Sequence, residues 1–358
     1  MKVAFTIGSL NRGGTETLLL DTLRQWQSAP FEMMLVHRSG GGLKDELYAA
    51  GPDCFELAPR RGRYISYLLQ LRKLIRQQHV GVIHAQYWLD ALYARVATIG
   101  LHIPIVLTFH GYFYKQNTIK NHLMRVTMRI VSQLIFVSNC ERTYFVDAYH
   151  LSIDKCHVVY NGIDFRKLNS VSKNTLISVL NSSHPKLCMV GSFSYSRAHM
   201  VICQALAQMR LPLEFYFIGA KNEQKSHAYQ DCYNYCKQHD LLQQVHFVGE
   251  QPNVYEWLQQ MDGFVYSTKH DTFGIAVIEA MAMGLPVVVN DWEVLKEVAG
   301  DEARYFQSDN AEDCANAIRS LLEHLQENKR IAQLVASEVK DTYSIQRYIN
   351  HLMEIYKL

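Results

Sequence analysis

Two carboxylates follow a short apolar run in the second half of the chain. Asp271 and Glu279 are eight residues apart, and Phe273 and Gly274 lie between them in a predicted turn. This spacing lets both carboxylates face one cleft when a helix starts at the turn. A carboxylate accepts two hydroxyl hydrogen bonds and suits a vicinal diol of ribose or another sugar, and the turn N–H groups suit phosphate or sugar oxygens. The pattern indicates a site for a nucleotide or a sugar.

A glycine pair near the N-terminus could also contact an anion. Gly13 and Gly14 follow the apolar run Val3–Ile7 and precede a helical pattern. Adjacent glycines let backbone N–H groups approach an anion at a helix N-terminus. The loop lacks the GxGxxG spacing, and no acidic residue completes a dinucleotide fingerprint, so a nicotinamide cofactor is disfavoured. Taken alone, the glycine pair is explained equally well by an ordinary turn.

Both loops require strands before them and helices after them, and the sequence provides this alternation. In the first half, strands are predicted at Val3–Ile7, Met34–His37, Val82–His84, Ile105–Phe109, Leu134–Val137 and Val158–Tyr160, with helices including Thr15–Gln27, Ile65–Gln78 and Leu89–Ile99. In the second half, strands are predicted at Leu187–Val190, Phe215–Ile218, Val245–Val248, Gly263–Tyr266 and Val287–Val289, with helices near His199–Met209, Gln224–Gln238, Ile275–Met283 and Ala311–Leu325. The apolar runs are nearly continuous, which is typical of parallel strands covered by helices on both faces.

A lapse in the alternation divides the chain. Residues 169–185 are rich in Ser, Asn and Lys, and we interpret them as a linker. The length of 358 residues agrees with two domains. We predict an α/β protein with two Rossmann-like, doubly wound parallel-sheet domains that face a central cleft. The predicted domains are residues 1–168, which would bind an acceptor, and 169–341, which would bind a donor, and a helix within 342–358 is a candidate to pack back on the first.

Composition excludes several classes of protein. Hydrophobic residues make up 48 % and charged residues 20 % of the chain, and the net charge of +2 does not indicate a nucleic-acid partner. The eight cysteines form no CxxC pair and the histidines no ligand cluster, so no metal is expected. No apolar run approaches the ~20 residues of a spanning helix, and the strand at residues 2–8 leaves no room for a signal peptide. We expect a cytoplasmic protein that can associate peripherally with the cytoplasmic face of a membrane.

Short motifs are spread over nearly the whole chain. They include Gly13-Gly14-Thr-Glu16, Val82-Ile-His84-Ala, Leu107-Thr-Phe-His110-Gly, Val137-Ser138-Asn139, Val159-Tyr-Asn161-Gly162-Ile-Asp164, Val190-Gly191, Ile218-Gly219 and Phe247-Val-Gly249. The acidic pair is followed by Glu-Ala-Met-Ala-x-Gly-x-Pro, which begins at Glu279 itself. With these motifs the chain resembles the retaining glycosyltransferases of family 4, which have the GT-B fold and an acidic signature of two glutamates separated by seven residues.

The resemblance implies a role for each matching residue. Glu279 would bind the ribose hydroxyls of a nucleotide-sugar donor, and Asp271 the hydroxyls of its sugar. Arg197 would neutralise the diphosphate in place of a metal ion, and His110 would face the acceptor side of the transferred sugar. The predicted site comprises the catalytic residues His110, Arg197 and Asp271, and the donor-binding residues Gly13, Gly14, Arg197, Gly249, Asp271, Thr272, Phe273, Gly274 and Glu279.

Two positions depart from the pattern of the family. Ser192 stands where the family has an arginine, and Asp271 stands where it has a glutamate. The expected function is metal-independent, retaining transfer of a sugar from a nucleotide-diphosphate donor, with UDP favoured over GDP, and without a cofactor. The acceptor would be a saccharide or a lipid-linked saccharide in cell-surface glycan assembly, such as that of lipopolysaccharide or capsule. A non-catalytic sugar-nucleotide-binding paralogue and a nucleotide-sugar 2-epimerase remain as alternatives.

Positive charge is concentrated in the first half. Residues 1–165 carry a net charge of +6 and the remainder −4. Between Ala58 and Cys140 there are eleven cations and one acid, Asp90. The cations are Arg60, Arg61, Arg63, Arg72, Lys73, Arg76, Arg95, Lys115, Lys120, Arg125 and Arg129. Cations beside aromatic residues suit an anionic membrane surface, although a solvated helix face would have the same composition.

Overall fold

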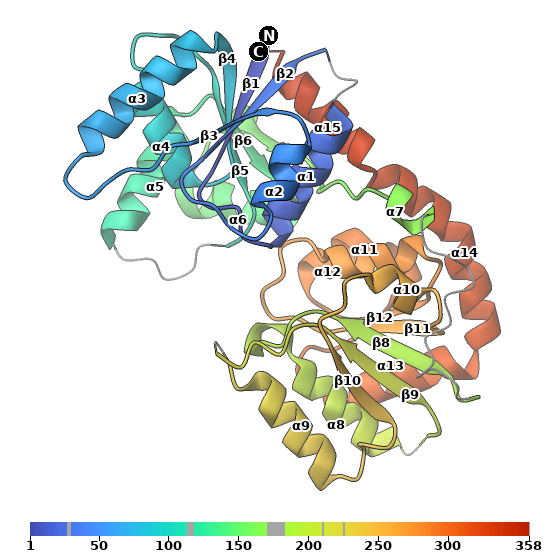
Figure 1. Cartoon of the computed structure of the whole chain (residues 1–358). Helices are drawn as coiled ribbons and strands as arrows, with labels where there is room; N and C mark the ends of the chain where they lie inside the picture. The colour runs from blue at the N-terminus through green and yellow to red at the C-terminus, as the bar shows by residue number, and fades with distance from the viewer. Residues whose placement is uncertain (27–29, 113–117, 170–182, 210, 225, 358) are drawn as a thin grey trace. The chain divides into compact units, whose positions relative to one another are not determined.

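The computed structural model describes residues 1–26, 30–112, 118–169, 183–209, 211–224 and 226–357. The chain forms two compact units: unit 1 comprises Met1–Ile163 with Ser344–Leu358, and unit 2 comprises Asp164–Tyr343. Each unit is built on a parallel sheet, which confirms the predicted fold class (Figure 1). Most of the predicted linker, residues 170–182, lies outside the described residues.

Unit 1 contains a seven-stranded sheet in the order β3-β2-β1-β4-β5-β6-β7. Its strands are β1 (Lys2–Ile7), β2 (Glu32–His37), β3 (Asp53–Glu56), β4 (Val80–Ala85), β5 (Ile105–Phe109), β6 (Gln133–Phe136) and β7 (Cys156–Val158). All neighbouring strands pair in parallel. The strand order reverses between β1 and β4, so the loops that follow these strands flank a topological switch point, where open α/β sheets bind ligands.

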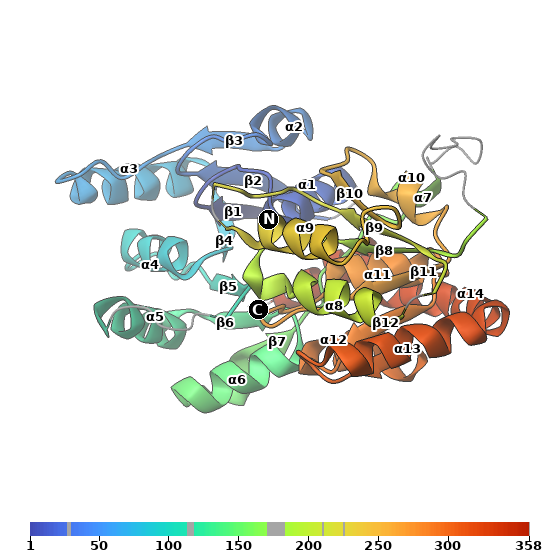
Figure 2. The same cartoon turned by 90° about the horizontal axis from the view of Figure 1, so that it is seen from below.

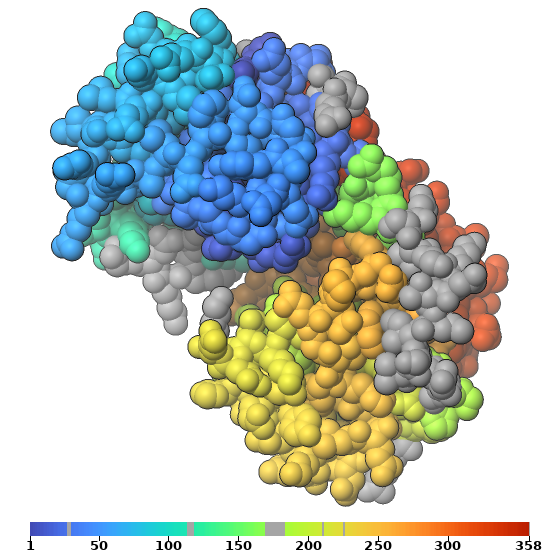
Figure 3. All heavy atoms as spheres, in the orientation of Figure 1, coloured from blue at the N-terminus to red at the C-terminus, as the bar shows by residue number. Residues whose placement is uncertain are grey.

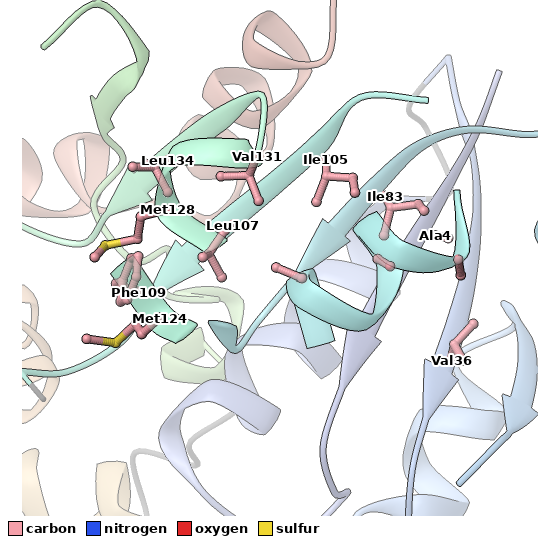
Figure 4. Close-up of a cluster of buried hydrophobic side chains, with 14 of the residues drawn as sticks. Ala4, Val36, Ile83, Ile105, Leu107, Phe109, Met124, Met128, Val131 and Leu134 are labelled. Carbon is pink, nitrogen blue, oxygen red and sulfur yellow. The ribbon is translucent and has the colours of Figure 1, made fainter. Parts of the chain in front are cut away.

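Helices cover both faces of this sheet. They are α1 (Gly14–Gln25), α2 (Lys44–Ala49), α3 (Tyr64–Gln77), α4 (Trp88–Ala97), α5 (Thr118–Ile130), α6 (Asn139–Tyr149) and α15 (Ile345–Ile355), with a short 3₁₀ turn η2 (Ile153–Lys155) before β7. Helices α3 to α6 bury apolar side chains against one face, and α1, α2 and α15 against the other. Figure 4 shows part of the first core, where Met124 and Met128 of α5 lie beside Leu107 and Phe109 of β5.

The C-terminal helix α15 belongs to unit 1. Gly162 permits a close approach, because a Cβ atom at this position would lie 2.6 Å from the Cα atom of Ile345. The hydroxyl of Tyr356 hydrogen-bonds to Nδ1 of the fully buried His84 in β4. The other ring nitrogen of His84 lies 2.6 Å from the hydroxyl of Thr108 in β5. The end of the chain is therefore fastened to the two strands whose loops carry Gln86 and His110.

Unit 2 contains a six-stranded parallel sheet in the order β10-β9-β8-β11-β12-β13. Its strands are β8 (Lys186–Val190), β9 (Glu214–Ile218), β10 (Val245–Gly249), β11 (Gly263–Tyr266), β12 (Val287–Asn290) and β13 (Arg304–Phe306). Its helices are α7 (Arg166–Asn169), α8 (His199–Met209), α9 (Ala228–Gln238), α10 (Val254–Leu258), α11 (Ile275–Ala282), α12 (Glu293–Ala299), α13 (Ala311–Glu323) and α14 (Leu325–Thr342), with 3₁₀ turns η4 (Tyr195–Arg197) and η5 (Gly300–Glu302). Helices α8, α9 and α13 lie on one face of the sheet and α10 to α12 on the other (Figures 1 and 2).

No helix within the described ranges combines the length and the apolar character that crossing a bilayer requires. Lys115, one of the eleven cations between Ala58 and Cys140, lies outside the described part of the chain.

Candidate functional site

The switch point of unit 2 brings together two predicted site segments. The strand order reverses between β8 and β11, which pair side by side. The loop after β8, residues 191–198, carries Arg197 and is called here the Arg197 loop. The loop after β11, residues 267–274, carries Asp271 and is called the Asp271 loop. Parallel strands end at one edge of the sheet, so both loops emerge where α/β folds bind ligands.

Hydrogen bonds fasten these loops to each other. The carbonyl oxygen of Ser196 accepts from the backbone N–H of Lys269 at 2.7 Å and from the hydroxyl of Thr268 at 3.2 Å. Thr268 is held in turn by the buried amide of Asn290 at the end of β12, which both accepts from its N–H at 2.9 Å and donates to its carbonyl at 2.8 Å. The backbone beside Arg197 is therefore fixed against the backbone that leads to Asp271.

The side chain of Arg197 lies over the end of β8. A Cβ atom at Gly191 would be 3.0 Å from the Cδ atom of Arg197, so the glycine makes room for the arginine. Nη1 of Arg197 donates to the hydroxyl of Tyr266 and lies 3.9 Å from Oδ2 of Asp271. The oxygens of Tyr266 and Asp271 raise the pKa of Arg197 above its usual value. The guanidinium is thus a fixed cation at the switch point.

Tyr266 is a central residue that the sequence did not identify. It is the last residue of β11 and is fully buried. Its hydroxyl accepts from Arg197 and donates to Oδ2 of Asp271 at 2.6 Å. Burial and the neighbouring carboxylate raise its pKa well above the usual value, so the hydroxyl stays protonated and continues to donate. A tyrosine that ends a buried strand looks like an ordinary core residue in a sequence, and no other signal marks it.

Asp271 uses its second oxygen within its own loop. Oδ1 accepts from the backbone N–H groups of Phe273 at 3.2 Å and Gly274 at 3.1 Å. These are the turn N–H groups to which the sequence assigned phosphate or sugar oxygens, and here they are occupied by the aspartate. The backbone carbonyl of Asp271 accepts from the indole of Trp292 at 2.9 Å. Asp271 therefore shapes the turn that starts α11 and positions Tyr266 and Arg197.

Packing and backbone conformation explain why phenylalanine and glycine occupy positions 273 and 274. The side chain of Phe273 is only 2 % exposed, and its ring packs edge-on against the ring of Tyr343 with 5.7 Å between the centroids. Phe273 is therefore a core residue and does not face the surface. Gly274 has φ +80°, a left-handed conformation that disfavours other residues, and a Cβ atom there would be 2.9 Å from the side chain of Leu295. Thr272, the third predicted residue of this turn, is half-buried.

Glu279 lies on the second turn of α11. It is half-buried, and its Oε1 accepts from the hydroxyl of Tyr255 in α10 at 2.5 Å. Tyr255 is a second positioning contact that the sequence did not reveal. Gly249, at the end of β10, has φ +82°, and its carbonyl accepts from the N–H of Gly219 at 2.9 Å. The predicted donor residues of unit 2 thus come from the ends of β8, β10 and β11 and from α11.

The switch point of unit 1 carries the glycine pair. Gly13 caps α1, and its carbonyl accepts from the N–H of Thr17 at 2.9 Å. A Cβ atom at Gly13 would lie 2.7 Å from the carboxylate of Glu16, whereas the space beside Gly14 is open. Burial raises the pKa of Glu16. The loop therefore presents the N-terminus of a twelve-residue helix, with Gly14 as its accessible position.

His110 follows β5 and is positioned by Gln86, which follows β4. Its Nε2 atom lies 2.8 Å from the side-chain oxygen of Gln86, and the backbone N–H of Gln86 donates to Thr6 of β1 at 2.9 Å. Burial lowers the pKa of His110 to about 4, so the imidazole is neutral at physiological pH. A neutral imidazole can exchange hydrogen bonds with a sugar hydroxyl.

A buried acid supports the loop that follows His110. Glu141 is fully buried in the first turn of α6, and one of its carboxyl oxygens accepts from the N–H of Val137 at 2.9 Å. It also hydrogen-bonds to the backbone of Gly111, and burial raises its pKa to about 8. Its own N–H donates to the hydroxyl of Ser138 at 3.1 Å. This serine-to-glutamate spacing is a capping pattern that the sequence contains.

Two further cations of unit 2 that follow strands of the sheet have partners of their own. Lys221 lies over the ring of Tyr229 at 4.5 Å, and Lys269 pairs with Asp309 at 2.7 Å. Ser192 lies half-buried beside Gly191. No group of three or more His, Cys, Asp or Glu side chains suited to a metal ion occurs among the described residues.

Two family descriptions match the sequence, one over each half. Glycosyltransferase Family 4 matches residues 12–167, and Glycosyl transferases group 1 matches residues 184–324. These ranges cover most of unit 1 and most of unit 2.

Two curated bacterial enzymes are between a fifth and a quarter identical to this chain over the residues that align. The N,N'-diacetylbacillosaminyl-diphospho-undecaprenol alpha-1,3-N-acetylgalactosaminyltransferase of Campylobacter jejuni is 24 % identical over 66 % of this chain and 65 % of its own length. The UDP-Gal:alpha-D-GlcNAc-diphosphoundecaprenol alpha-1,3-galactosyltransferase of Escherichia coli is 21 % identical over 78 % and 76 %. The chain thus spans slightly under two thirds of the first of these relatives and about three quarters of the second.

Solved structures share the whole architecture. A glycosyltransferase from Rickettsia africae has a TM-score of 0.89 at 18 % identity, covering 99 % of this chain and 97 % of its own. The Anabaena protein HepE in complex with UDP has a TM-score of 0.88 at 18 % identity, covering all of both chains. At identities this low the likeness shows the fold alone, which is the GT-B fold with two Rossmann-like domains.

Proposed function

Because the chain belongs to glycosyltransferase family 4, we propose that it transfers a sugar from a UDP-sugar to a saccharide or lipid-linked saccharide acceptor. One observation carries the proposal: a fixed cation, Arg197, shares the switch point of unit 2 with the carboxylate of Asp271, and Glu279 lies on α11, the helix that follows the Asp271 loop. A cation suits a diphosphate, and carboxylates suit the hydroxyls of ribose and sugar. These are the two kinds of group that a nucleotide sugar presents.

We propose UDP as the nucleotide of the donor because relatives of this chain bind it or are named for it. HepE has been solved with UDP and with UDP-glucose, and the E. coli relative is named for UDP-Gal. Both curated relatives described above are named for diphospho-undecaprenol acceptors. A lipid-linked saccharide in cell-surface glycan assembly is therefore our proposal for the acceptor of this chain, and the cytoplasmic face of a membrane for its location.

Arg197 is proposed to neutralise the donor diphosphate, with Gly13 and Gly14 contributing backbone contacts. No metal or other cofactor is required, because a fixed guanidinium stabilises the charge that develops on the leaving phosphate. Glu279, oriented by Tyr255, is proposed to bind the ribose diol. The bond from the anomeric carbon to the phosphate oxygen breaks, an acceptor hydroxyl forms the new glycosidic bond on the same face, and its proton passes to the departing phosphate. The chain contributes orientation and charge stabilisation.

Asp271 is proposed to have two tasks. Its carboxylate holds Tyr266 and the turn before α11, and the same carboxylate, whose side chain is 18 % exposed, is assigned to the hydroxyls of the donor sugar. Thr272 and Gly249 would line the donor, and Phe273 and Gly274 would set the shape of the turn from beneath. On the acceptor side, the neutral imidazole of His110 is proposed to hydrogen-bond the reacting saccharide.

A non-catalytic, nucleotide-binding paralogue is the alternative that one observation favours. The Oδ1 atom of Asp271 is engaged by its own turn, and Ser192 supplies no second cation. Incubating the purified chain with UDP-sugars separates the two functions, because a transferase releases UDP while a binding paralogue only retains the donor. Appearance of a 2-epimer without acceptor would instead establish the epimerase alternative.

A further inference from the structure

Three buried cysteines meet where two helices of unit 2 pack together. Cys203 lies on α8, and Cys232 and Cys236 lie one turn apart on α9. Each of them is at most 1 % exposed. The thiol of Cys203 hydrogen-bonds with the thiols of both α9 cysteines. A single buried cysteine is an ordinary small core residue, but thiols in contact across two helices can also react with each other, and the proposed transfer reaction uses none of them.

Small side chains let α8 and α9 approach each other closely. On α9 the buried residues Ala228, Cys232 and Cys236 recur every four positions and therefore form one stripe along the helix. The two helices lie side by side in both cartoon views (Figures 1 and 2). The distance between packed helices depends on the side chains at the contact, and small residues bring it to the lower end of ~8–10 Å. A disulfide needs Cα atoms ~4.4–6.8 Å apart, and facing cysteines on closely packed helices can meet this requirement.

Contact between the thiols makes Cys236 more acidic than Cys203. The hydrogen bond with Cys203 lowers the pKa of Cys236, although burial acts in the opposite direction. Hydrogen bonds with Cys232 and Cys236, together with burial, raise the pKa of Cys203 well above its usual value. The thiolate is the reacting form of a cysteine. Cys236 is therefore the nucleophile of the pair, and Cys203 keeps its proton beside it.

The thiols lie close to two places where a small oxidant can enter. Cys236 belongs to the last turn of α9, and residues 237–240 after it are exposed. In the space-filling view, the yellow atoms of this region form an outer edge of unit 2 (Figure 3). Local opening begins where the backbone is exposed, as it is at such a helix end. Nearer the start of α9, Cys232 lies in the wall of a cavity of about 300 Å³ that α8 and α9 line together.

The same two helices hold the Arg197 loop. The ring of Phe193 in this loop stacks on the ring of His199, the first residue of α8, with 4.2 Å between the centroids. It also packs edge-on against the ring of Tyr229 in the first turn of α9, with 5.3 Å between the centroids. Cys203 follows His199 by one helical turn, and Cys236 follows Tyr229 by two. A change in the spacing of α8 and α9 at the cysteines therefore reaches the loop that carries Arg197.

We propose that Cys203 and Cys236 are a modification site, at which hydrogen peroxide converts the two thiols into a disulfide that weakens donor binding. The thiolate of Cys236 attacks a peroxide oxygen, the O–O bond breaks with loss of hydroxide, and a sulfenic acid forms. The sulfur of Cys203 then attacks the sulfenic sulfur, the S–O bond breaks, and the hydroxide leaves with the proton of Cys203 as water. In total the two thiols lose two electrons and two protons, and the peroxide is reduced to two molecules of water.

The disulfide changes the packing of α8 against α9. An S–S bond is ~2.05 Å long, which is shorter than a hydrogen-bonded contact between two thiols, so its formation draws the helices together. His199 and Tyr229 then hold Phe193 in a different position, and the backbone that carries Arg197 moves with it. The effect on donor binding rests on the proposed role of Arg197, whereas formation of the disulfide does not.

Peroxide titration of the purified full chain, followed by mass spectrometry, tests the site. The reduced chain is treated with hydrogen peroxide, its remaining thiols are alkylated, and it is digested without reductant. We expect two peptides joined through Cys203 and Cys236. The affinity of the oxidised chain for UDP, measured by calorimetry, should fall about threefold or more, because Arg197 is no longer held in place for the diphosphate. Dithiothreitol should remove the bond and restore the affinity.

Alanine variants assign the effect to the two thiols. Cys203→Ala and Cys236→Ala should each keep their UDP affinity in peroxide, since neither can form the bond. Cys232→Ala and Cys314→Ala are the matched controls, because they remove equally buried thiols from α9 and α13, and both should respond to peroxide as the wild type does. Thermal unfolding of the reduced variants shows that they fold. Reversal by dithiothreitol requires no variant, so it tests the proposal even where a substitution disturbs the core.

Four results would overturn the proposal. They are no joined peptides after peroxide treatment, a bond from Cys203 to Cys232 in place of Cys236, an unchanged UDP affinity in the chain that carries the Cys203–Cys236 bond, and a loss of affinity that persists in Cys203→Ala. The last result would assign the loss to oxidation of another residue. Absence of UDP binding in the reduced wild type would instead contradict the proposed donor site, and mass spectrometry would still decide whether the disulfide forms.

Discussion

Arg197 and Asp271 face each other across the ends of β8 and β11, with 3.9 Å between Nη1 and Oδ2. The hydroxyl of Tyr266 joins them, because it accepts from the arginine and donates to the aspartate. A guanidinium held in this way loses little conformational freedom when a diphosphate binds. The entropic cost of ordering the side chain therefore does not weaken the binding of the diphosphate. Tyr266 is therefore a positioning residue for the cation that we assign to the donor.

Tyr266→Phe should weaken UDP binding about tenfold, because a hydrogen bond to a charged group contributes ~1.5–3 kcal/mol. The ring remains to fill the core, so the fold should persist. Isothermal titration calorimetry with UDP measures the effect. Tyr305→Phe is the matched control, since the Tyr305 hydroxyl donates to the Gly300 carbonyl elsewhere in unit 2. Equal UDP affinity in wild type and Tyr266→Phe would remove Tyr266 from the site.

Glu279→Ala should lose roughly 2–4 kcal/mol of transition-state stabilisation, because two charge-assisted hydrogen bonds to the ribose diol disappear. Comparison of kcat/KM for donor in the variant and the wild type gives this value. Glu293→Ala, which removes an exposed carboxylate at the start of α12, serves as the control. Near-wild-type turnover of Glu279→Ala would show that another residue binds the ribose.

Chelation should leave activity intact. The diphosphate charge is assigned to Arg197 and to helix N-termini, and neither depends on a divalent ion. The measurement compares initial rates with and without EDTA after dialysis. Loss of activity in EDTA, restored by Mg²⁺ or Mn²⁺, would contradict the assignment to Arg197.

Glu141 should make folding stability fall as pH rises from about 4.5 to 8. Burial raises its pKa to about 8 in the folded chain, so the folded state holds a proton that the unfolded state releases over this range. The slope contributed is at most about 1.4 kcal/mol per pH unit. Urea unfolding from pH 5 to 8 measures it, and Glu141→Gln should reduce the slope while keeping a hydrogen-bond acceptor. If the free energy of unfolding of Glu141→Gln depended on pH as steeply as that of the wild type, Glu141 would be ionised in the folded chain.

The sequence predicted the two parallel sheets because their strands are short, apolar and buried on both faces. It did not predict β3 (Asp53–Glu56), whose four residues are partly exposed and carry an acid at each end, so no hydrophobic pattern marks them. It also did not predict α14, whose two buried residues, Ala336 and Val339, leave a mostly polar pattern. Elements with few buried side chains depend on tertiary contacts that a single sequence does not display.

The candidate site divides along similar lines. The spacing of the acidic motif identified Asp271 and Glu279, and the family resemblance identified Arg197. The structure brings Arg197 and Asp271 together. It could not identify Tyr266, whose hydroxyl emerges from an otherwise apolar strand end. It also assigned the turn N–H groups to the donor, whereas the short side chain of Asp271 reaches back to occupy them. The hydrogen-bond partner of a polar group depends on which side chains can come within bonding distance of it, and these distances are set only when the chain folds.

UDP release from a panel of UDP-sugars by the purified chain tests the central claim most directly. With saccharide acceptors present, the wild type should release UDP from at least one donor, and Arg197→Ala should reduce that release at least a hundredfold while unfolding at a similar temperature. Two results would contradict a transferase that uses Arg197 to stabilise the departing diphosphate. One is UDP release that Arg197→Ala leaves unchanged, and the other is no UDP release from any UDP-sugar by a chain that still binds UDP.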